Sequence, residues 1–226
     1  MKRFNEISLH SLREGVYDKN IFKAIFLAGG PGSGKSYVTK RSTGGLGLKV
    51  VNSDDMFERM MNQASLSLKM PPEEEQEKDI IRDKAKKLTV KRHDNYVDGR
   101  LGLVIDSTGR DSAKILRHKS QLDELGYDTY MVFVNTSLDV ALERNAKRDR
   151  SVPESLVVKS WKEVQSNMGL FSNAFRKGFI VVDNNDASED VLKGVWKRVT
   201  GLLRNKVTNT RAKNWITMEL KRKRRP

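Results

Sequence analysis

The chain has 226 residues, of which 37% are hydrophobic and 32% charged, so a single globular domain with a substantial core is expected. It contains no apolar run of about 18 residues and no apolar signal-peptide segment, which excludes a membrane-spanning helix and favours a cytoplasmic protein. Cysteine is absent, which excludes disulfides, cysteine metal sites and cysteine nucleophiles.

Short apolar runs alternate with helical patterns along most of the chain. The runs lack strict polar alternation, as is typical of buried parallel strands covered on both faces. The predicted strands are 22–28, 48–52, 102–106, 129–135 and 179–183. The predicted helices are 34–41, 54–63, 72–98, 111–125, 138–149, 153–167 and 188–203. This order predicts an α/β fold with a five-stranded parallel sheet between two helical layers. The expected organisation is an N-terminal arm (1–20), one domain (21–204) and a C-terminal tail (205–226).

The first predicted strand ends in a glycine-rich stretch that matches the phosphate-loop pattern G-x-x-x-x-G-K-[ST]. Glycines allow backbone N–H groups to turn inward around an anion, and the following helix adds the positive end of its dipole. In this pattern the lysine reaches the β- and γ-phosphates and the last hydroxyl ligates Mg²⁺. The sequence therefore predicts a site for ATP and Mg²⁺. Its residues are Gly29, Gly30, Pro31, Gly32, Ser33, Gly34, Lys35 and Ser36.

The second predicted strand leads into "NSDDMFERM". In a parallel sheet its end lies at the same edge as the phosphate loop, so Asp54 is placed to face the transferred phosphate. A hydroxyl nucleophile needs an acceptor for its proton within about 3 Å, and Asp54 is the candidate. An alternative interpretation is that Ser53 or Asp54 only caps the helix that follows. Asp55 is interpreted as a first-turn acid.

The helix 72–98 opens with Pro72 and acidic residues, which are helix-start signals. Its predicted buried stripe is Ile81, Ala85 and Leu88, with Ile80 beside it. The three histidines show no metal-ligand spacing and are interpreted as ordinary surface or helix residues; they are His10, His93 and His118.

The third strand ends in "LVIDSTGR". A hydrophobic strand that closes on an aspartate has the form of a Walker B carboxylate, so Asp106 is predicted to hold Mg²⁺ together with Ser36. Thr108 and Arg110 follow on the same edge and are predicted to contact the acceptor substrate, Arg110 through a phosphate. The alternative for Arg110 is an ordinary surface arginine near a helix start.

The stretch "LERNAKRDRSVP" concentrates basic residues after a helix. Part of this charge fits the usual preference for cations at a helix C-terminus, but four basic residues within seven exceed that need. The pattern predicts a basic lid over the triphosphate, with Arg144 and Arg148 stabilising the migrating phosphoryl group. After the fifth strand, "VVDNND" places Asn184 and Asn185 near the expected nucleotide base.

The C-terminal segment 205–226 has eight Lys and Arg and one acid, Glu219, so it carries +7 of the chain's net charge of +14. A tail of this charge is typical of contact with nucleic acid or another polyanion. A solubilising end or a partner-docking tail is the alternative.

Taken together, residues 22–186 resemble the P-loop kinases of the zeta-toxin and polynucleotide-kinase group. The likeness to polynucleotide 5′-hydroxyl kinases lies in "GGPGSGKS", "NSDD" and "ERNAKRDRSVPESLV". It implies that Asp54 is the general base and that Arg144 and Arg148 are lid arginines. An acceptor-binding arginine that these kinases carry three residues after the base is Phe57 here.

The likeness to zeta toxins lies in "LVIDSTGR", "LDELGYDTYMVFV" and "MGLFSNAF". These toxins phosphorylate a UDP-amino sugar, and the resemblance again places the base on Asp54 and an acceptor contact on Arg110. Their strand-three carboxylate is usually Glu, whereas this chain has Asp106. The resemblance implies the P-loop NTPase three-layer α/β/α sandwich and ATP-dependent transfer to a hydroxyl acceptor, a polynucleotide 5′-hydroxyl or related nucleotide. A UDP-N-acetylglucosamine kinase and a non-enzymatic nucleotide-bound nucleic-acid-binding or assembly protein remain open.

Overall fold

The computed structural model describes residues 15–67, 72–147, 152–186 and 188–224. Its centre is a five-stranded sheet in the order β2-β3-β1-β4-β5, in which every pairing is parallel. The strands are β1 (Lys23–Ala28), β2 (Lys49–Val51), β3 (Leu103–Asp106), β4 (Asp128–Asn135) and β5 (Phe179–Asp183). The predicted α/β class and all five predicted strands are therefore confirmed.

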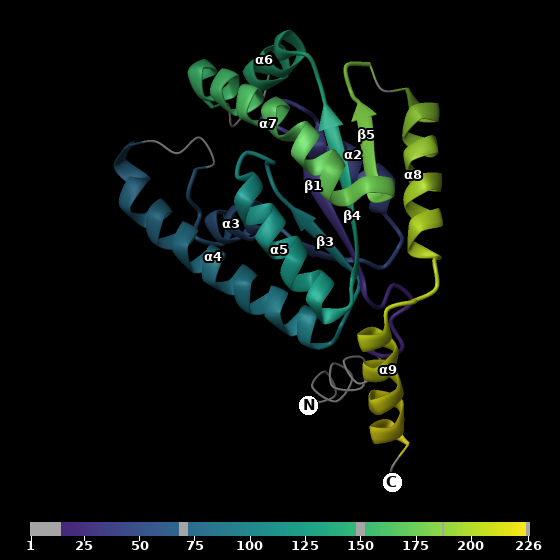
Figure 1. Cartoon of the computed structure of the whole chain (residues 1–226). Coiled ribbons are helices and arrows are strands. Elements are labelled where there is room, and N and C mark those ends of the chain that lie inside the picture. Colours follow the sequence, from purple (N-terminus) through teal and green to yellow (C-terminus); the bar gives the residue numbers. More distant parts are fainter. Residues whose placement is uncertain (1–14, 68–71, 148–151, 187, 225–226) are drawn as a thin grey trace.

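Helices cover both faces of this sheet (Figure 1). The α-helices are α2 (Lys35–Thr43), α3 (Ser53–Gln63), α4 (Glu75–Asp98), α5 (Ser112–Leu125), α6 (Leu138–Ala146), α7 (Glu154–Phe175), α8 (Glu189–Leu203) and α9 (Thr210–Lys223). Two 3₁₀ turns are η1 (Pro72–Glu74) and η2 (Arg176–Gly178).

Alternate residues of β1 point into two separate cores, which makes the molecule a three-layer α/β/α sandwich. On one face Phe26 packs with α5 and α7, for example against Ile115 and Phe171. On the other face Ile25 packs with α2 and α8, together with Val195. Strands buried on both faces explain why these runs lack a polar alternation.

Helices α3 and α4 form a smaller core of their own around Phe57, Met61 and Ala85. The predicted stripe of α4 is wrong at Leu88, which is 41% exposed. The inward face of α4 instead continues from Ala85 to partly buried Thr89 and His93. Polar side chains occupy this face because a cavity, and not a packed core, lies beneath it.

The part of 205–226 that the structure describes contains a helix that the sequence did not predict. Asn209 caps α9 by accepting from the backbone N–H groups of Arg211 and Ala212. Ala212 is fully buried, and the Trp215 ring meets Phe22 edge-on at 5.6 Å. The first half of α9 therefore packs on the domain, whereas its last turn is basic. The division of the chain at residues 20 and 204 stays a prediction.

Of the described helices, none is long and apolar enough to cross a membrane. Because the strands are parallel, their carboxyl ends meet at one edge of the sheet. That edge receives the phosphate loop and the segments that follow β2, β3, β4 and β5, whereas α9 lies at the opposite edge (Figure 1).

Candidate active site

The phosphate loop turns sharply between β1 and α2. Gly32 and Gly34 both have φ 76°, a left-handed conformation that glycine adopts without strain. A Cβ on Gly32 would lie 2.1 Å from the Ala141 carbonyl oxygen, and one on Gly34 would lie 2.3 Å from Asn184 Nδ2. Both glycines are therefore required by the backbone angle and by close neighbours, as expected of a loop that wraps an anion.

The segment after β5 holds this loop from one side. Asn184 is 4% exposed and donates from Nδ2 to the Ser33 carbonyl oxygen at 2.7 Å. Arg144 of α6 donates to the carbonyl oxygens of Asn184 at 2.7 Å and Asn185 at 2.9 Å. Arg144 thus lies beside the phosphate loop but is tied to the β5 segment. Arg148, the second predicted lid arginine, lies outside the described residues.

Lys35, the first residue of α2, forms an ion pair with Asp106 at the end of β3. The second carboxylate oxygen of Asp106 accepts from Asn52 Nδ2 at 2.9 Å. Both charged side chains are largely buried, with 16% and 11% exposure. The structure therefore brings together the predicted phosphate-binding lysine and the predicted metal-binding carboxylate.

Asp54 is the second residue of α3, and it is not the helix cap. The cap is Asn52, whose Oδ1 accepts from the Asp54 N–H at 2.8 Å, so the alternative that Ser53 or Asp54 caps the helix is wrong. The Asp54 carboxylate is exposed and makes no hydrogen bond or ion pair with any residue that the structure describes. It is therefore available to a substrate.

The Asp55 carboxylate also contacts Asn52 and accepts a hydrogen bond from its Nδ2 at 3.1 Å. Partial burial and the negative charge of Asp106 raise the pKa of the Asp55 carboxyl above its usual value. A cation placed near Asp55 and Asp106 would relieve this repulsion.

The oxygen atoms in this region fit Mg²⁺. Ser36, Asp55 and Asp106 line one side of a cavity of about 610 Å³. Within the described residues no cluster of three or more acidic or histidine side chains forms a complete metal cage. Magnesium is usually bound in proteins by one or two carboxylates together with substrate phosphates.

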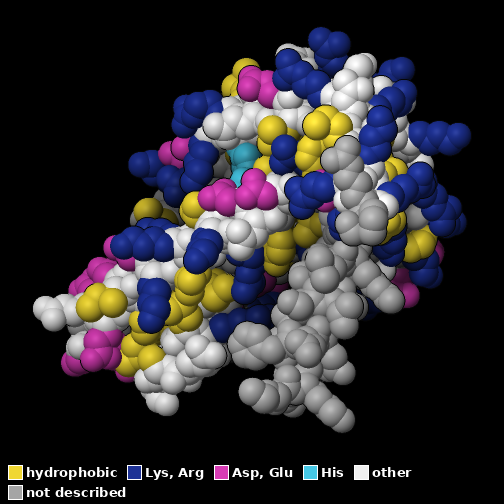
Figure 2. Space-filling model, turned by 90° about the horizontal axis from the view of Figure 1, so that it is seen from below, with side chains coloured by type: hydrophobic (Ala, Val, Ile, Leu, Met, Phe, Trp, Pro, Cys, Tyr) yellow, Lys and Arg dark blue, Asp and Glu magenta, His cyan; other side chains and the backbone are white. Residues whose placement is uncertain are grey.

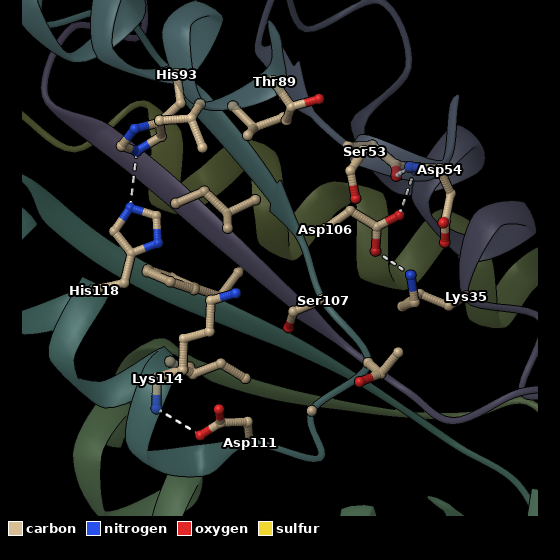
Figure 3. Close-up of a pocket in the computed structure, with 18 residues that line it drawn as sticks. Lys35, Ser53, Asp54, Thr89, His93, Asp106, Ser107, Asp111, Lys114 and His118 are labelled. Carbon is tan, nitrogen blue, oxygen red and sulfur yellow. Dashed lines mark hydrogen bonds and ion pairs between the residues drawn. The ribbon is translucent and has the colours of Figure 1, made fainter. Parts of the chain in front are cut away.

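A second cavity, of about 480 Å³, opens beside the Lys35–Asp106 pair and extends between α3, α4 and α5. Figure 3 shows Lys35, Asp106 and Asp54 at one end of it. Thr108 lines it as well. Its volume suits a nucleotide-sized molecule.

Arg110, which was predicted to contact the acceptor, is paired with α7 in this structure. Its Nε donates to Glu163 Oε2 of α7 at 2.6 Å, and it does not line the 480 Å³ cavity. This hydrogen bond lowers the pKa of Glu163. Asn167 holds the local backbone by donating to the carbonyl oxygens of Gly109 and Arg110.

The far end of the same cavity contains a histidine pair that was interpreted from the sequence as ordinary residues. His93 of α4 and His118 of α5 form a hydrogen bond of 2.8 Å between their Nε2 atoms. Burial, with the nearby His93 and Lys114, lowers the pKa of His118 to about 4. One signal was available in the sequence: His93 stands four residues after Thr89 and eight after Ala85, on the inward face of α4.

The parallel five-stranded sheet, with the phosphate loop between β1 and α2, defines a P-loop α/β domain. Residues 25–171 match the model of a family described as AAA domain, and because this match spans more than half of the chain, the chain belongs to that family. No curated protein matches the chain.

Two solved kinases have a similar fold. A gluconokinase from Sinorhizobium meliloti 1021 is 15% identical, with 82% of this chain and 95% of that chain covered and a TM-score of 0.51. A shikimate kinase from Bacteroides thetaiotaomicron is 14% identical, with coverage of 81% and 99% and a TM-score of 0.51. At such identities the likeness establishes the fold alone.

Proposed function

We propose that the protein is a kinase that transfers the γ-phosphoryl group of ATP to a hydroxyl group of a nucleotide-sized acceptor. The observation that carries the proposal is the position of Asp54, whose unpaired carboxylate lines the 480 Å³ cavity next to Lys35 and Asp106. A nucleotide-binding protein without phosphotransfer would need the phosphate loop but not a free carboxylate at the mouth of a second cavity.

The proposed chemistry follows from these side chains. The loop N–H groups and Lys35 would bind the phosphates, and Ser36 with Asp106 would hold Mg²⁺. Magnesium bound there would neutralise charge on the phosphate oxygens. Asp54 accepts the proton of the acceptor hydroxyl as its oxygen attacks the γ-phosphorus and the bond to the β-phosphate oxygen breaks. Arg144 lies near enough to the loop to stabilise the developing charge, provided that it leaves the Asn184 and Asn185 carbonyls.

The acceptor we favour is a polynucleotide 5′-hydroxyl or a related nucleotide, in line with the resemblance to polynucleotide kinases and with the basic C-terminal segment. Phe57 departs from the polynucleotide-kinase pattern, and a UDP-N-acetylglucosamine kinase is therefore the second candidate. The Phe57 side chain is 1% exposed and Arg82 lies over its ring at 4.3 Å, so this position faces the α3–α4 core and not the cavity. The acceptor-binding arginine that polynucleotide kinases carry at this position is therefore missing at position 57 of this chain.

The test is incubation of the full chain with γ-labelled ATP, Mg²⁺ and a panel of acceptors. The panel contains 5′-hydroxyl DNA and RNA, nucleoside monophosphates and UDP-N-acetylglucosamine. We expect label in one class of acceptor. Bound ATP with no label in any of them would contradict the kinase and favour the non-enzymatic alternative.

A further inference from the structure

The end of the 480 Å³ cavity that contains the histidine pair also has a cationic side chain, Lys114. Lys35 and Lys114 are the two cationic residues other than histidine among those that line this cavity. Lys35 is paired with Asp106 at the phosphate-loop end. Lys114 extends from α5 into the cavity on the same side as His118 (Figure 3), and its ammonium group has no hydrogen-bond or ion-pair partner within the described part of the chain.

The histidine pair next to Lys114 forms hydrogen bonds through three of its four ring nitrogens. His93 Nδ1 lies 3.1 Å from Asp94 Oδ1, which fits donation of the His93 Nδ1–H to this carboxylate. Neutral His93 then accepts at Nε2 from the Nε2–H of His118. This leaves Nδ1 of His118 as a ring nitrogen without a hydrogen-bond partner among the described residues.

The surroundings of this end combine apolar side chains with polar ones, because Thr89 and the acidic Asp111 line the cavity together with Lys114 (Figure 3). The Phe26 ring meets His118 edge-on at 5.5 Å, and Ile105 and Ile115 line the same cavity. Lys114 is exposed, and its ammonium group would attract an anion in the cavity through a charge-assisted hydrogen bond that neutral ligands cannot form.

We propose that the acceptor substrate carries an anionic group, a phosphate or a carboxylate, which binds between Lys114 and His118 while its reacting hydroxyl lies at Asp54. This proposal rests on the proposed kinase function, and it narrows the substrate class to acidic hydroxyl compounds. Neutral nucleosides and neutral sugars would fill the cavity without this contact.

The binding test uses the wild-type chain and pairs of probes that differ in charge. Adenosine and adenosine 3′-monophosphate test a phosphate, and glucitol and gluconate test a carboxylate. Calorimetry measures each dissociation constant, with NMR of the imidazole nitrogens as a second readout. We expect at least one anionic probe to bind about tenfold or more tightly than its neutral partner and to shift the His118 signal.

The variant test compares Lys114→Met with Arg117→Met, which removes an exposed cation of α5 outside the cavity. We expect Lys114→Met to remove the tenfold preference and Arg117→Met to retain it. Equal affinity for the charged and neutral probes, or a preference unchanged in Lys114→Met, would overturn the anion site.

The experiments distinguish a failure of the proposed anion site from a failure of the proposed kinase function. Binding that depends on Lys114 without any phosphorylated product would support the anion site and contradict the kinase. Phosphorylation of neutral and anionic acceptors with the same KM, unaffected by Lys114→Met, would support the kinase and overturn the anion site.

Discussion

At the scale of residues, the proposed site is organised around the two oxygens of Asp106. One is paired with Lys35 and the other accepts from Asn52, which also caps α3 and bonds Asp55. One asparagine thus connects the end of β3 to the start of α3 and leaves the Asp54 carboxylate unpaired. The sequence pointed to Lys35, Asp54 and Asp106 through their motifs, but it did not reveal that Asn52 links Asp106 to the start of α3.

The lowered pKa of His118 predicts a pH-dependent stability. Between the ordinary value of about 6.5 and the folded value of about 4, the folded chain binds fewer protons than the unfolded chain. The contribution of His118 is therefore fully present above pH 6.5 and is lost as the pH falls toward 4. We expect His118→Phe to flatten the decrease in unfolding free energy between pH 7.5 and 5 by about 1–2 kcal/mol. Urea unfolding at both pH values measures this decrease. An equal decrease in the unfolding free energy of His118→Phe and of the wild type would contradict the prediction.

At the scale of elements, the sequence predicted the sheet well because its strands are apolar runs between clear turn signals. Two helices were less predictable. α7 extends eight residues past the predicted end at 167, because Phe171 and Phe175 continue its buried stripe onto the sheet. α9 carries apolar residues at helical spacing, Ala212, Trp215, Ile216 and Leu220, but they lie within a strongly basic segment that was interpreted as a tail, and their burial depends on Phe22, far away in the chain. The histidine pair also depends on contact between distant helices, α4 and α5, which one sequence does not report.

Contact between the phosphate loop and α6 gives a prediction at this scale. Gly32 and Gly45 have similar left-handed backbones, with φ 76° and 74°, but only Gly32 has a neighbour in the way of a Cβ, while Gly45 has nothing within 4 Å. Gly45→Ala should therefore cost only the backbone strain, about 1–2 kcal/mol. We expect Gly32→Ala to lower the unfolding free energy by at least about 1 kcal/mol more, because the Ala141 backbone must move. Urea unfolding of both variants checks this, and equal losses would refute the close approach.

At the scale of the whole molecule, the proposed phosphotransfer site and the basic last turn of α9 lie at opposite edges of the sheet (Figure 1). Seen from the α9 end, Lys and Arg side chains are spread widely over the surface and are interspersed with acidic ones (Figure 2). Nucleic acid bound to the last turn of α9 would therefore act as a separate anchor and would not itself form part of the acceptor cavity.

This separation predicts how charge removal affects binding. Deleting 205–226 would also remove buried Ala212 and the Trp215 contact, so substitutions are the sharper test. We expect Lys221→Gln with Arg224→Gln to weaken single-stranded DNA or RNA binding and to reduce its salt slope by about 2, with ATP affinity unchanged. The control pair, Lys193→Gln with Lys197→Gln on α8, should leave the slope intact. A slope that stays the same in the α9 variant would remove nucleic acid as the partner of the tail.

The central claim, that Asp54 receives the proton of an acceptor hydroxyl during phosphoryl transfer, is tested most directly by single-turnover transfer from γ-labelled ATP. Wild type and Asp54→Asn are compared with the acceptor that the panel identifies, and ATP affinity is measured in parallel. We predict a decrease in rate of about 10²- to 10⁴-fold in Asp54→Asn with the ATP dissociation constant unchanged. Transfer by Asp54→Asn at a rate near that of wild type would contradict the account.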